Sequence, residues 1–362
     1  MRNINILHVD SERTWRGGQQ QAMYLFSGML ERGFRTAMVT RTGSEMAKLC
    51  REKEFPVYEL PMRGEIDIWS AWKIAKICKD NNFRILHLHS AHAVAIGALA
   101  KYFFSALKLI GVRRVDFPVK NNFFSRQKYL RMDTIVCISE NIRRVMLQCG
   151  FKPEQLTTIH SGIDTRKFAD VVPDSEFRIK EKIPANHLII GTTAALVGHK
   201  DYPTLLKAAK LVLDVRSDIT FMAAGEGYKR ESLEQLHREL KLSNNFRFLG
   251  FRKDVGNLLK QMDLFVLSSH LEGLGTSILD AMALGLSVVG TEAGGIPEMV
   301  SNNFNGLLVP RKNPERLASA LLKLCENSGL REKLGENALQ TADKFKVSKM
   351  VEKNIGLYGM MR

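Results

Sequence analysis

Two carboxylates and a glycine-rich loop form the most informative group of residues in the chain. Glu272 and Asp280 lie eight positions apart in the segment SSHLEGLGTSILDAMALG, residues 268–285, which we expect to pass from a strand into a helix. The free backbone N–H groups and partial positive charge at a helix start favour an anion such as a diphosphate. Carboxylates repel phosphate, so Glu272 and Asp280 are better suited to accept hydrogen bonds from sugar and ribose hydroxyls. The alternative is two solvated acids. The residues that would offer the N–H groups are Gly273, Leu274, Gly275 and Thr276.

Two further loops have residues that suit a phosphate. Gly17 and Gly18 follow a predicted strand and open a predicted helix, so the backbone there can approach an anion closely. Lys200 lies in the loop after another predicted strand and can neutralise a phosphate. A glycine pair also begins the segment GGIPE, residues 294–298. Simple structural turns are the alternative interpretation of both glycine pairs.

Three histidines occur near the end of a predicted strand, in the segment LHLHSAH, residues 86–92. Strand alternation places His87 and His89 on one face, and His89, at the last strand position, is the best candidate to face a ligand. A metal site is one interpretation, but no carboxylate accompanies His87, His89 and His92, and buried hydrogen-bonded histidines are another. We predict no metal site.

Alternating strands and helices surround these groups and predict two parallel sheets covered on both faces. The segment GEG, residues 225–227, is not followed by the third glycine of a dinucleotide fingerprint, because Arg230 stands there. Residues 161–187 read as a linker, and residues 314–362 as almost entirely helical. The predicted strands are 4–9, 36–40, 85–89 and 134–138, then 188–193, 219–224, 246–249, 264–267 and 287–290; the predicted helices are 19–32, 66–79, 93–107 and 140–149, then 202–215, 230–240, 254–261 and 276–284.

Length and composition agree with two domains in a reducing compartment. The chain has 362 residues and is 45% hydrophobic, enough for a core in each half. Its five scattered cysteines lack metal-like spacing and suit buried free thiols. We find no secretory signal and no uncharged apolar run of about 18 residues. We therefore expect a cytoplasmic protein.

Positive charge is concentrated in the first half of the chain. The net charge is +15, and residues 1–175 hold 27 Lys and Arg against 17 Asp and Glu. Residues 101–131 combine eight basic residues with several aromatic ones, a mixture that suits an anionic membrane surface. Aromatic residues in the core and cations in water are the alternative. Nucleic acid is not expected, since no helix-turn-helix, RNP or zinc pattern occurs. Among the aromatic and apolar residues of the segment are Tyr102, Phe103, Phe104, Leu107, Phe117, Phe123 and Phe124.

The ordered set of motifs resembles the retaining glycosyltransferases of family 4, the glycosyl transferases of group 1, which have the GT-B fold. The similarity covers nearly the whole chain, and its most specific element is the acid-x7-acid spacing from Glu272 to Asp280. It implies two Rossmann-like doubly wound domains that face a cleft: residues 1–170, which bind an acceptor, and residues 171–345, which bind a nucleotide sugar. A helix over residues 346–362 would pack back on the first domain. The other matching segments are GG at 17–18, His89, DTIVCIS at 133–139, SGID at 161–164, AGEG at 224–227, LGF at 249–251, SSHLEG at 268–273 and GGIPE at 294–298.

The resemblance implies a role for each matching residue. Glu272 and the amides of residues 273–276 would meet the sugar hydroxyls and the diphosphate, Asp280 the ribose, and Lys200 the phosphates. The backbone of Phe251 and Arg252 would lie near the base. Gly17 and Gly18 would close over the diphosphate, and His89 would lie beside the transferred sugar. Two positions depart from the family: Asp280 stands for the usual glutamate, and Ala195 for a common arginine.

The implied activity is transfer of a hexose or heptose, with retention and without a metal or other cofactor, to a glycan or lipid-linked acceptor. Lipopolysaccharide core or another cell-envelope glycan fits this description, at the inner face of the plasma membrane. The alternatives are a nucleotide-sugar epimerase or phosphorylase on the same fold, or a catalytically silent sugar-binding relative.

Overall fold

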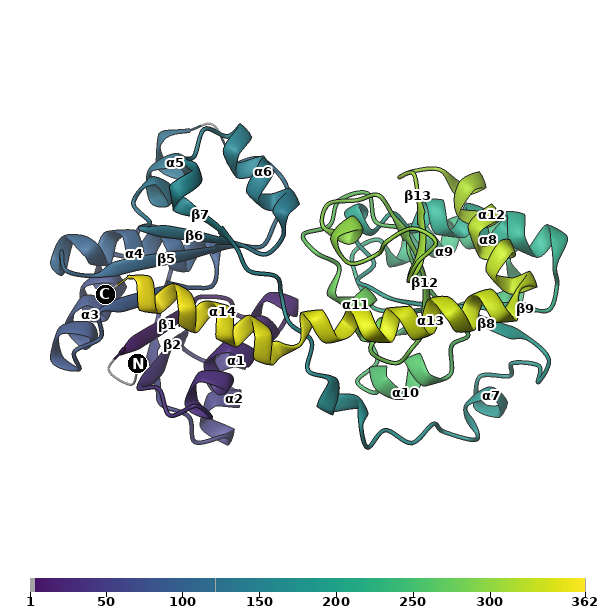
Figure 1. Cartoon of the computed structure of the whole chain (residues 1–362), viewed down its shortest axis with the longest axis horizontal. Helices are drawn as coiled ribbons and strands as arrows, with labels where there is room; N and C mark the ends of the chain where they lie inside the picture. The colour runs from purple at the N-terminus through teal and green to yellow at the C-terminus, as the bar shows by residue number, and fades with distance from the viewer. Residues whose placement is uncertain (1–3, 121, 362) are drawn as a thin grey trace. The chain divides into compact units, whose positions relative to one another are not determined.

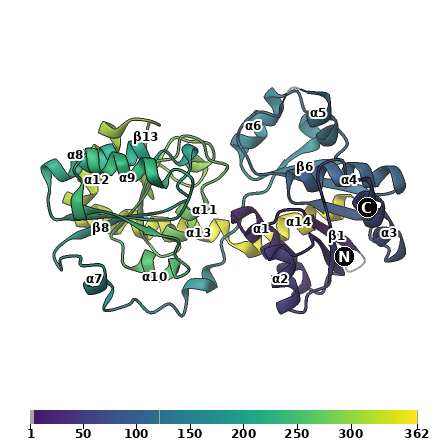
Figure 2. The same cartoon turned by 180° about the vertical axis from the view of Figure 1, so that it is seen from behind.

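The computed structural model describes residues 4–120 and 122–361, which divide into two compact units. The first unit is Met1–Gly162 together with Val347–Arg362, and the second is Ile163–Lys346. Each unit has one parallel sheet between helices (Figures 1 and 2). The chain thus passes from the first unit into the second after residue 162, whereas the resemblance implied a boundary at residue 170.

The first unit contains a seven-stranded sheet with the order β3-β2-β1-β4-β5-β6-β7, in which neighbouring strands run parallel. The order reverses between β1 and β4, because the chain extends the sheet first in one direction and then in the other. Its strands are β1 (Ile6–Asp10), β2 (Thr36–Arg41), β3 (Val57–Leu60), β4 (Ile85–Leu88), β5 (Lys108–Arg113), β6 (Thr134–Cys137) and β7 (Leu156–Thr158). Its α-helices are α1 (Gly17–Leu30), α2 (Glu45–Glu52), α3 (Ile68–Asp80), α4 (Ala91–Phe103), α5 (Phe123–Leu130), α6 (Glu140–Gln148) and α14 (Val347–Met360).

The second unit contains a six-stranded parallel sheet with the order β10-β9-β8-β11-β12-β13. Here the order reverses between β8 and β11. Its strands are β8 (Leu188–Thr193), β9 (Ile219–Ala224), β10 (Phe246–Gly250), β11 (Leu264–Leu267), β12 (Ser287–Thr291) and β13 (Gly306–Val309). Its α-helices are α7 (Phe177–Lys180), α8 (Tyr202–Val215), α9 (Arg230–Glu239), α10 (Val255–Lys260), α11 (Thr276–Met282), α12 (Pro314–Glu326) and α13 (Ser328–Ala342).

Continuous apolar runs form the central strands, as burial on both faces requires. Every residue of β1, β9 and β11 is buried. All five cysteines are free thiols, and four of them are buried. The two predicted parallel sheets are confirmed.

The C-terminal helix α14 belongs to the first unit, although the whole second unit and most of the first separate it from α1 in sequence. It contacts α1 (Figure 1), and its Tyr358 is hydrogen bonded to His87 of β4 at 2.5 Å. The chain therefore closes the first unit with its last segment.

Several short elements were not predicted. The apolar run of β5 is only four residues long and includes Gly111, so its periodicity is weak. At Gly111 a β-carbon would come within 3.1 Å of Met132 Cγ, which shows that the glycine permits close packing there. The strands β3, β7 and β13 have three or four residues each and give equally little signal.

Two helix glycines provide a matched test of packing. At Gly335 in α13, a β-carbon would lie 2.1 Å from the Gly285 carbonyl oxygen, which follows α11, whereas at Gly356 in α14 no atom lies within 4 Å. We expect Gly335→Ala to lower the free energy of unfolding by about 1–3 kcal/mol through overpacking. Gly356→Ala should raise it by roughly 0.5–1 kcal/mol, because alanine loses less conformational entropy in a helix. Thermal unfolding followed by circular dichroism measures both, and equal effects would contradict the close approach of α13.

Candidate functional site

Lys200 and Glu272 form the central pair of the second unit. Lys200 lies in the loop after β8, and Glu272 in the loop after β11. Lys200 Nζ forms an ion pair with Glu272 Oε2, and the two side chains are only 15% and 13% exposed. Ser269 Oγ donates to the same carboxylate oxygen at 3.0 Å. Because β8 and β11 are the neighbours at which the strand order reverses, the pair lies at a switch point, where parallel sheets bind ligands.

Hydrogen bonds to the backbone hold these two loops together. The N–H of His270 donates to the carbonyl of His199 at 2.9 Å, and Ser268 Oγ donates to the carbonyl of Lys200 at 3.0 Å. The N–H of Gly295 donates to the carbonyl of Glu272 at 3.1 Å, which ties the turn at residues 294–298 to the same loop. The relative position of Lys200 and Glu272 is therefore fixed by the backbone as well as by their ion pair.

The loop between Glu272 and α11 is crowded, and it needs glycine at one position. Gly275 has φ +91°, and a β-carbon there would lie 3.2 Å from Glu272 Cγ and 3.4 Å from Ile296 Cγ1. The side chain of Leu274 is buried, so this residue offers the loop only its backbone, whereas Gly273 and Thr276 are partly exposed. The structure thus brings the residues of the predicted anion site together around Glu272.

Asp280 lies in the second turn of α11 and has a partner that the sequence did not predict. Lys167 Nζ forms an ion pair with Asp280 Oδ1 at 2.6 Å, and the Asp280 side chain is 20% exposed. Burial raises the pKa of Asp280, and Lys167 acts against this shift. The only sequence signal for Lys167 is that it lies three residues after the segment SGID at 161–164 and next to a second basic residue, Arg166.

Phe251 and Arg252 follow β10, and the loop that they begin is attached to its neighbours. The N–H of Gly225 donates to the carbonyl of Gly250 at 2.8 Å. The guanidinium of Arg252 donates to both oxygens of Asp254, at 2.8 and 2.7 Å, and lowers the pKa of Asp254 to about 2. The Arg252 side chain is therefore engaged by Asp254 and, at 3.4 Å, by Glu181, whereas Phe251 is 71% exposed.

In the first unit, α1 begins at the predicted glycine pair. Gly17 is its first residue, the N-cap residue Arg16 makes no side-chain cap, and the first turn contains no acidic residue. At Gly18 a β-carbon would lie 3.2 Å from Arg114 Cδ, so the side chain of Arg114 passes directly over this turn. The sequence did not single out Arg114, because a basic residue at a strand end is usually solvated.

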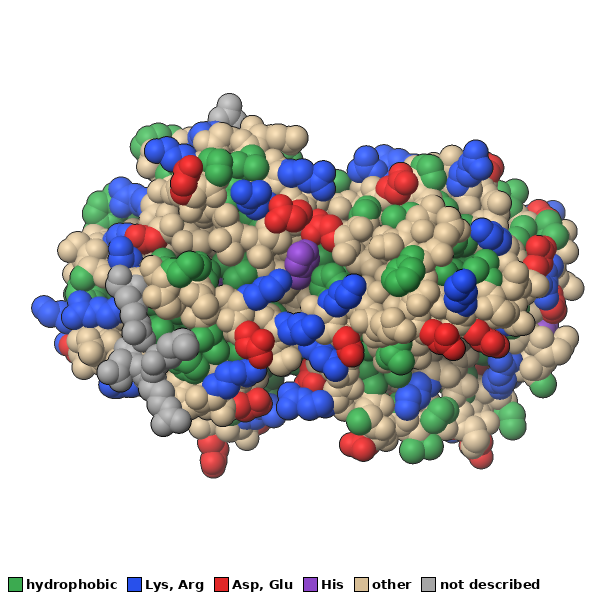
Figure 3. Space-filling model, in the orientation of Figure 1, with side chains coloured by type: hydrophobic (Ala, Val, Ile, Leu, Met, Phe, Trp, Pro, Cys, Tyr) green, Lys and Arg blue, Asp and Glu red, His purple; other side chains and the backbone are tan. Residues whose placement is uncertain are grey.

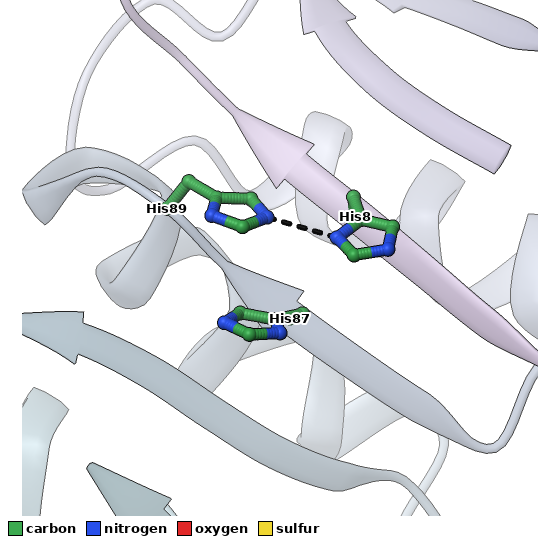
Figure 4. A group of neighbouring side chains, drawn as sticks. All are labelled: His8, His87 and His89. Atoms are coloured by element: carbon green, nitrogen blue, oxygen red, sulfur yellow. Dashed lines mark hydrogen bonds between the residues drawn. The ribbon is translucent and has the colours of Figure 1, made fainter. Parts of the chain in front are cut away.

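His89 lies inside the first unit in a stack of three imidazoles (Figure 4). His89 Nε2 and His8 Nδ1 are hydrogen bonded at 2.9 Å, and the rings of His87 and His89 are 4.5 Å apart and nearly parallel. The predicted cluster is thus partly wrong, because His92 is exposed on α4 and His8 of β1 takes its place. His8 is next to β4 in the sheet, a neighbour that the sequence did not reveal.

The three imidazoles do not have the arrangement of a metal site. Their ligand nitrogens lie within 4.8 Å of one another, but the ring planes of His87 and His89 differ by only 10°, and those of His8 and His89 by 15°. Lone pairs in nearly parallel ring planes do not converge on one point. Burial lowers the pKa of His8 to about 3 and the pKa values of His87 and His89 well below their usual range, so the stack is uncharged. The geometry favours a hydrogen-bonded interior.

The basic segment at residues 101–131 is less open than its sequence implies. Lys101 and Lys108 pair with Asp133, at 2.8 and 3.7 Å, and Lys128 pairs with Glu65 at 2.6 Å. Leu107 is buried, so its predicted place on an exposed surface is wrong. Much of the formal charge is therefore compensated within the unit. Basic side chains nevertheless occur over the visible surfaces of both units (Figure 3).

Exposed aromatic side chains gather on three successive helices of the first unit, which we call the aromatic surface. α3 contacts α4, and α4 contacts α5. Lys73 Nζ lies 5.4 Å and 5.1 Å from the ring centres of Trp69 and Trp72, which the sequence analysis overlooked within a predicted helix. Within the described part of the chain, no helix is long and apolar enough to cross a membrane. The aromatic surface consists of Trp69, Trp72, Tyr102, Phe103, Phe123 and Phe124, which are 43–74% exposed.

Two family models match consecutive parts of the chain. The model described as glycosyltransferase family 4 matches residues 15–167, and the model described as glycosyl transferases group 1 matches residues 173–341. Together they span both structural units and include each of the loops described above.

Individual relatives agree with these matches. An *Escherichia coli* UDP-Gal:α-D-GlcNAc-diphosphoundecaprenol α-1,3-galactosyltransferase is 24% identical over 314 residues, which cover 81% of this chain and 79% of the relative. A *Rickettsia africae* glycosyltransferase has a TM-score of 0.88 at 21% identity, covering 100% of this chain and 99% of its own. *Anabaena* HepE in complex with UDP has a TM-score of 0.87 at 19% identity, covering 99% of this chain and 100% of its own. The chain therefore belongs to family 4 of the glycosyltransferases and has the GT-B fold.

Proposed function

We propose that this protein is a retaining glycosyltransferase that moves a hexose or heptose from a nucleotide diphosphate sugar to a lipid-linked glycan. The observation that carries the proposal is the ion pair of Lys200 and Glu272 at the switch point of the second sheet. An ammonium and a carboxylate held side by side suit a ligand with a phosphate next to a polyhydroxyl group.

The donor roles follow from this arrangement. Lys200 and the amides of residues 273–276 receive the diphosphate, and the carboxylate of Glu272 accepts hydrogen bonds from the sugar hydroxyls. Asp280, held by Lys167, accepts from the ribose, and the backbone of Phe251 and Arg252 lies beside the base. The titles of the relatives support a nucleotide sugar, since one names UDP-Gal and another a complex with UDP.

The first unit contributes the remaining groups of this proposal. Gly17 and Gly18 offer backbone N–H groups to the diphosphate, and His89 orients the transferred sugar through one imidazole nitrogen. The neutral state of His89 suits a hydrogen bond to a hydroxyl rather than an ion pair.

The reaction breaks the bond between the anomeric carbon and the diphosphate oxygen, and the acceptor oxygen bonds to the same face of that carbon. The developing charge on the diphosphate is offset by Lys200 and the loop amides, each donor being worth about 2.7–4 kcal/mol in comparable sites. The acceptor hydroxyl gives its proton to the departing diphosphate, so no protein nucleophile and no metal ion is needed. The sugar passes through an oxocarbenium-like state.

The acceptor is a lipid-linked glycan, such as lipopolysaccharide core or another cell-envelope glycan. The *E. coli* relative is named for a diphosphoundecaprenol-linked acceptor, which supports this choice. The aromatic surface supports it independently, because exposed tryptophan and phenylalanine side chains with nearby lysines suit the interface of an anionic bilayer. The protein would then act at the inner face of the plasma membrane.

Replacement of Lys200 by methionine should lower kcat/KM about 100- to 1,000-fold, because the leaving diphosphate loses a cation. Glu272→Gln should also lower kcat/KM. Each single variant leaves its partner as an unpaired, mostly buried charge, so the double variant should be more thermally stable than either, although it should remain inactive. Donor binding is measured as the rise in Tm with UDP-, GDP- and ADP-sugars. Lys210→Met, an exposed lysine paired with Asp214, is the control. Full activity of Lys200→Met would rule out the proposed role.

Transfer with retention predicts that an α-linked donor gives an α-linked product. Proton NMR of the first product formed distinguishes the two anomers, and a β-linked product would contradict the proposed mechanism.

Nucleotide release should require an acceptor, which an epimerase would not need. EDTA should leave the rate unchanged if no metal takes part.

Binding to the bilayer should depend on both salt and aromatic residues. The protein should float with anionic liposomes at low ionic strength and detach at high ionic strength. The double variants Trp69→Ala/Trp72→Ala and Phe123→Ala/Phe124→Ala should each reduce the bound fraction several-fold. Phe304→Ala, an exposed aromatic residue of the second unit, is the matched control. No salt-sensitive flotation of the unmodified protein would exclude the membrane proposal.

A further inference from the structure

A small, half-open cavity lies in the first unit, and polar side chains form part of its lining. Its volume is about 20 Å³, which leaves room for about one or two oxygen atoms. Residues at the ends of four parallel strands, together with α1 and α14, surround it. The polar side chains that line it include Gln21, His87, His89, Arg114, Ser161 and Asn354.

Several of these side chains have a buried polar atom without a hydrogen-bond partner among the described residues. Such atoms are His89 Nδ1, Ser161 Oγ and Asn354 Oδ1, and each of these three residues is no more than 3% exposed. Arg114 Nε and His87 Nε2 are likewise buried atoms without a partner, although the Arg114 side chain as a whole is only partly buried. A buried polar group without a partner costs about 1–3 kcal/mol, so a group of them around one cavity points to a ligand there.

Arg114 is the only Lys, Arg, Asp or Glu that lines the cavity, and its Nε has no hydrogen-bond partner in the described ranges. Its burial lowers its pKa to about 10, so it stays charged at neutral pH. Asp10 is near enough to oppose this shift but is hydrogen bonded to Gln19 and to the N–H of Glu12 instead. The charge of Arg114 is therefore not matched by a hydrogen-bonded carboxylate.

The start of α1 adds a second donor group beside Arg114. α1 has 14 residues, no side-chain cap and no acidic residue in its first turn, so its first N–H groups remain available to an anion. Gly18 brings this turn against Arg114 because it has no β-carbon. Arg114 and Ser161 both line the cavity, and the start of α1 lies against Arg114.

We propose that Arg114 and Ser161 bind an oxyanion of the acceptor substrate, a carboxylate or the edge of a phosphate. The assignment to the acceptor rests on the proposed function. The guanidinium holds two oxygens at once, which matches the room in the cavity, and Ser161 donates to one of them.

The test is calorimetric titration of the full-length protein with inorganic phosphate and, separately, with acetate, while UDP is held at saturation. UDP fills the donor site, so the remaining signal reports the Arg114 site. We expect one equivalent of at least one anion to bind, and Arg114→Gln to weaken it about tenfold or more. Arg114→Lys keeps the charge but loses the two parallel N–H donors of the guanidinium, so its affinity for the anion should lie between those of the unmodified protein and Arg114→Gln. Ser161→Ala should weaken anion binding by a smaller factor. The anion that binds more tightly distinguishes a phosphate from a carboxylate.

Arg131→Gln is the control, because Arg131 is a basic residue of the same segment that stacks on Tyr102 instead of lining the cavity. It should bind the anion as the unmodified protein does. Equal anion binding by the unmodified protein and both Arg114 variants would overturn the inference. Binding of neither anion would overturn it too, since the cavity would then hold water only. A parallel loss of UDP affinity in Arg114→Gln would move Arg114 to the donor and overturn the acceptor assignment. Failure of the unmodified protein to bind any nucleotide would instead count against the proposed function.

Discussion

The reversal of strand order between β8 and β11 determines the rest of the second unit. A parallel sheet can bind a ligand beyond its strand ends at such a switch point, and here hydrogen bonds hold the loops after the two strands together. Lys200 and Glu272, which are far apart in sequence, meet there as a partly buried ion pair. Such a pair is costly to desolvate and adds little net stability, so its presence is best explained by a ligand.

The interior of the first unit also contains buried polar groups that add little to stability. A stack of neutral histidines occupies the sheet where a more stable core would place apolar side chains, and Tyr358 of α14 is hydrogen bonded to one of them. Arg114 lies beside this stack without a hydrogen-bonded carboxylate. Buried polar groups without partners are costly, and under the proposed function the cavity that they line would receive part of the acceptor.

The aromatic surface extends this argument from the interior to the outside of the first unit. Exposed aromatic side chains lower solubility, and six of them on three neighbouring helices exceed what a solvated face requires. Several lysines of the same region are paired with Asp133 or Glu65. Contact with a bilayer would therefore depend more on aromatic insertion than the formal charge of residues 101–131 suggests.

The sequence by itself determined the two parallel sheets, most of the long helices and the loop around Glu272, because apolar runs and glycine positions are local properties. It did not reveal β5 or β13, whose runs are too short to show a period. Only the tertiary structure placed His8 beside His89, Lys167 on Asp280 and Arg114 over Gly18. These contacts depend on strand order and on the return of α14, and a parallel sheet joins residues that are distant in sequence. His92 was wrongly grouped with His87 and His89 for the same reason: closeness along the chain does not persist where a strand passes into a helix.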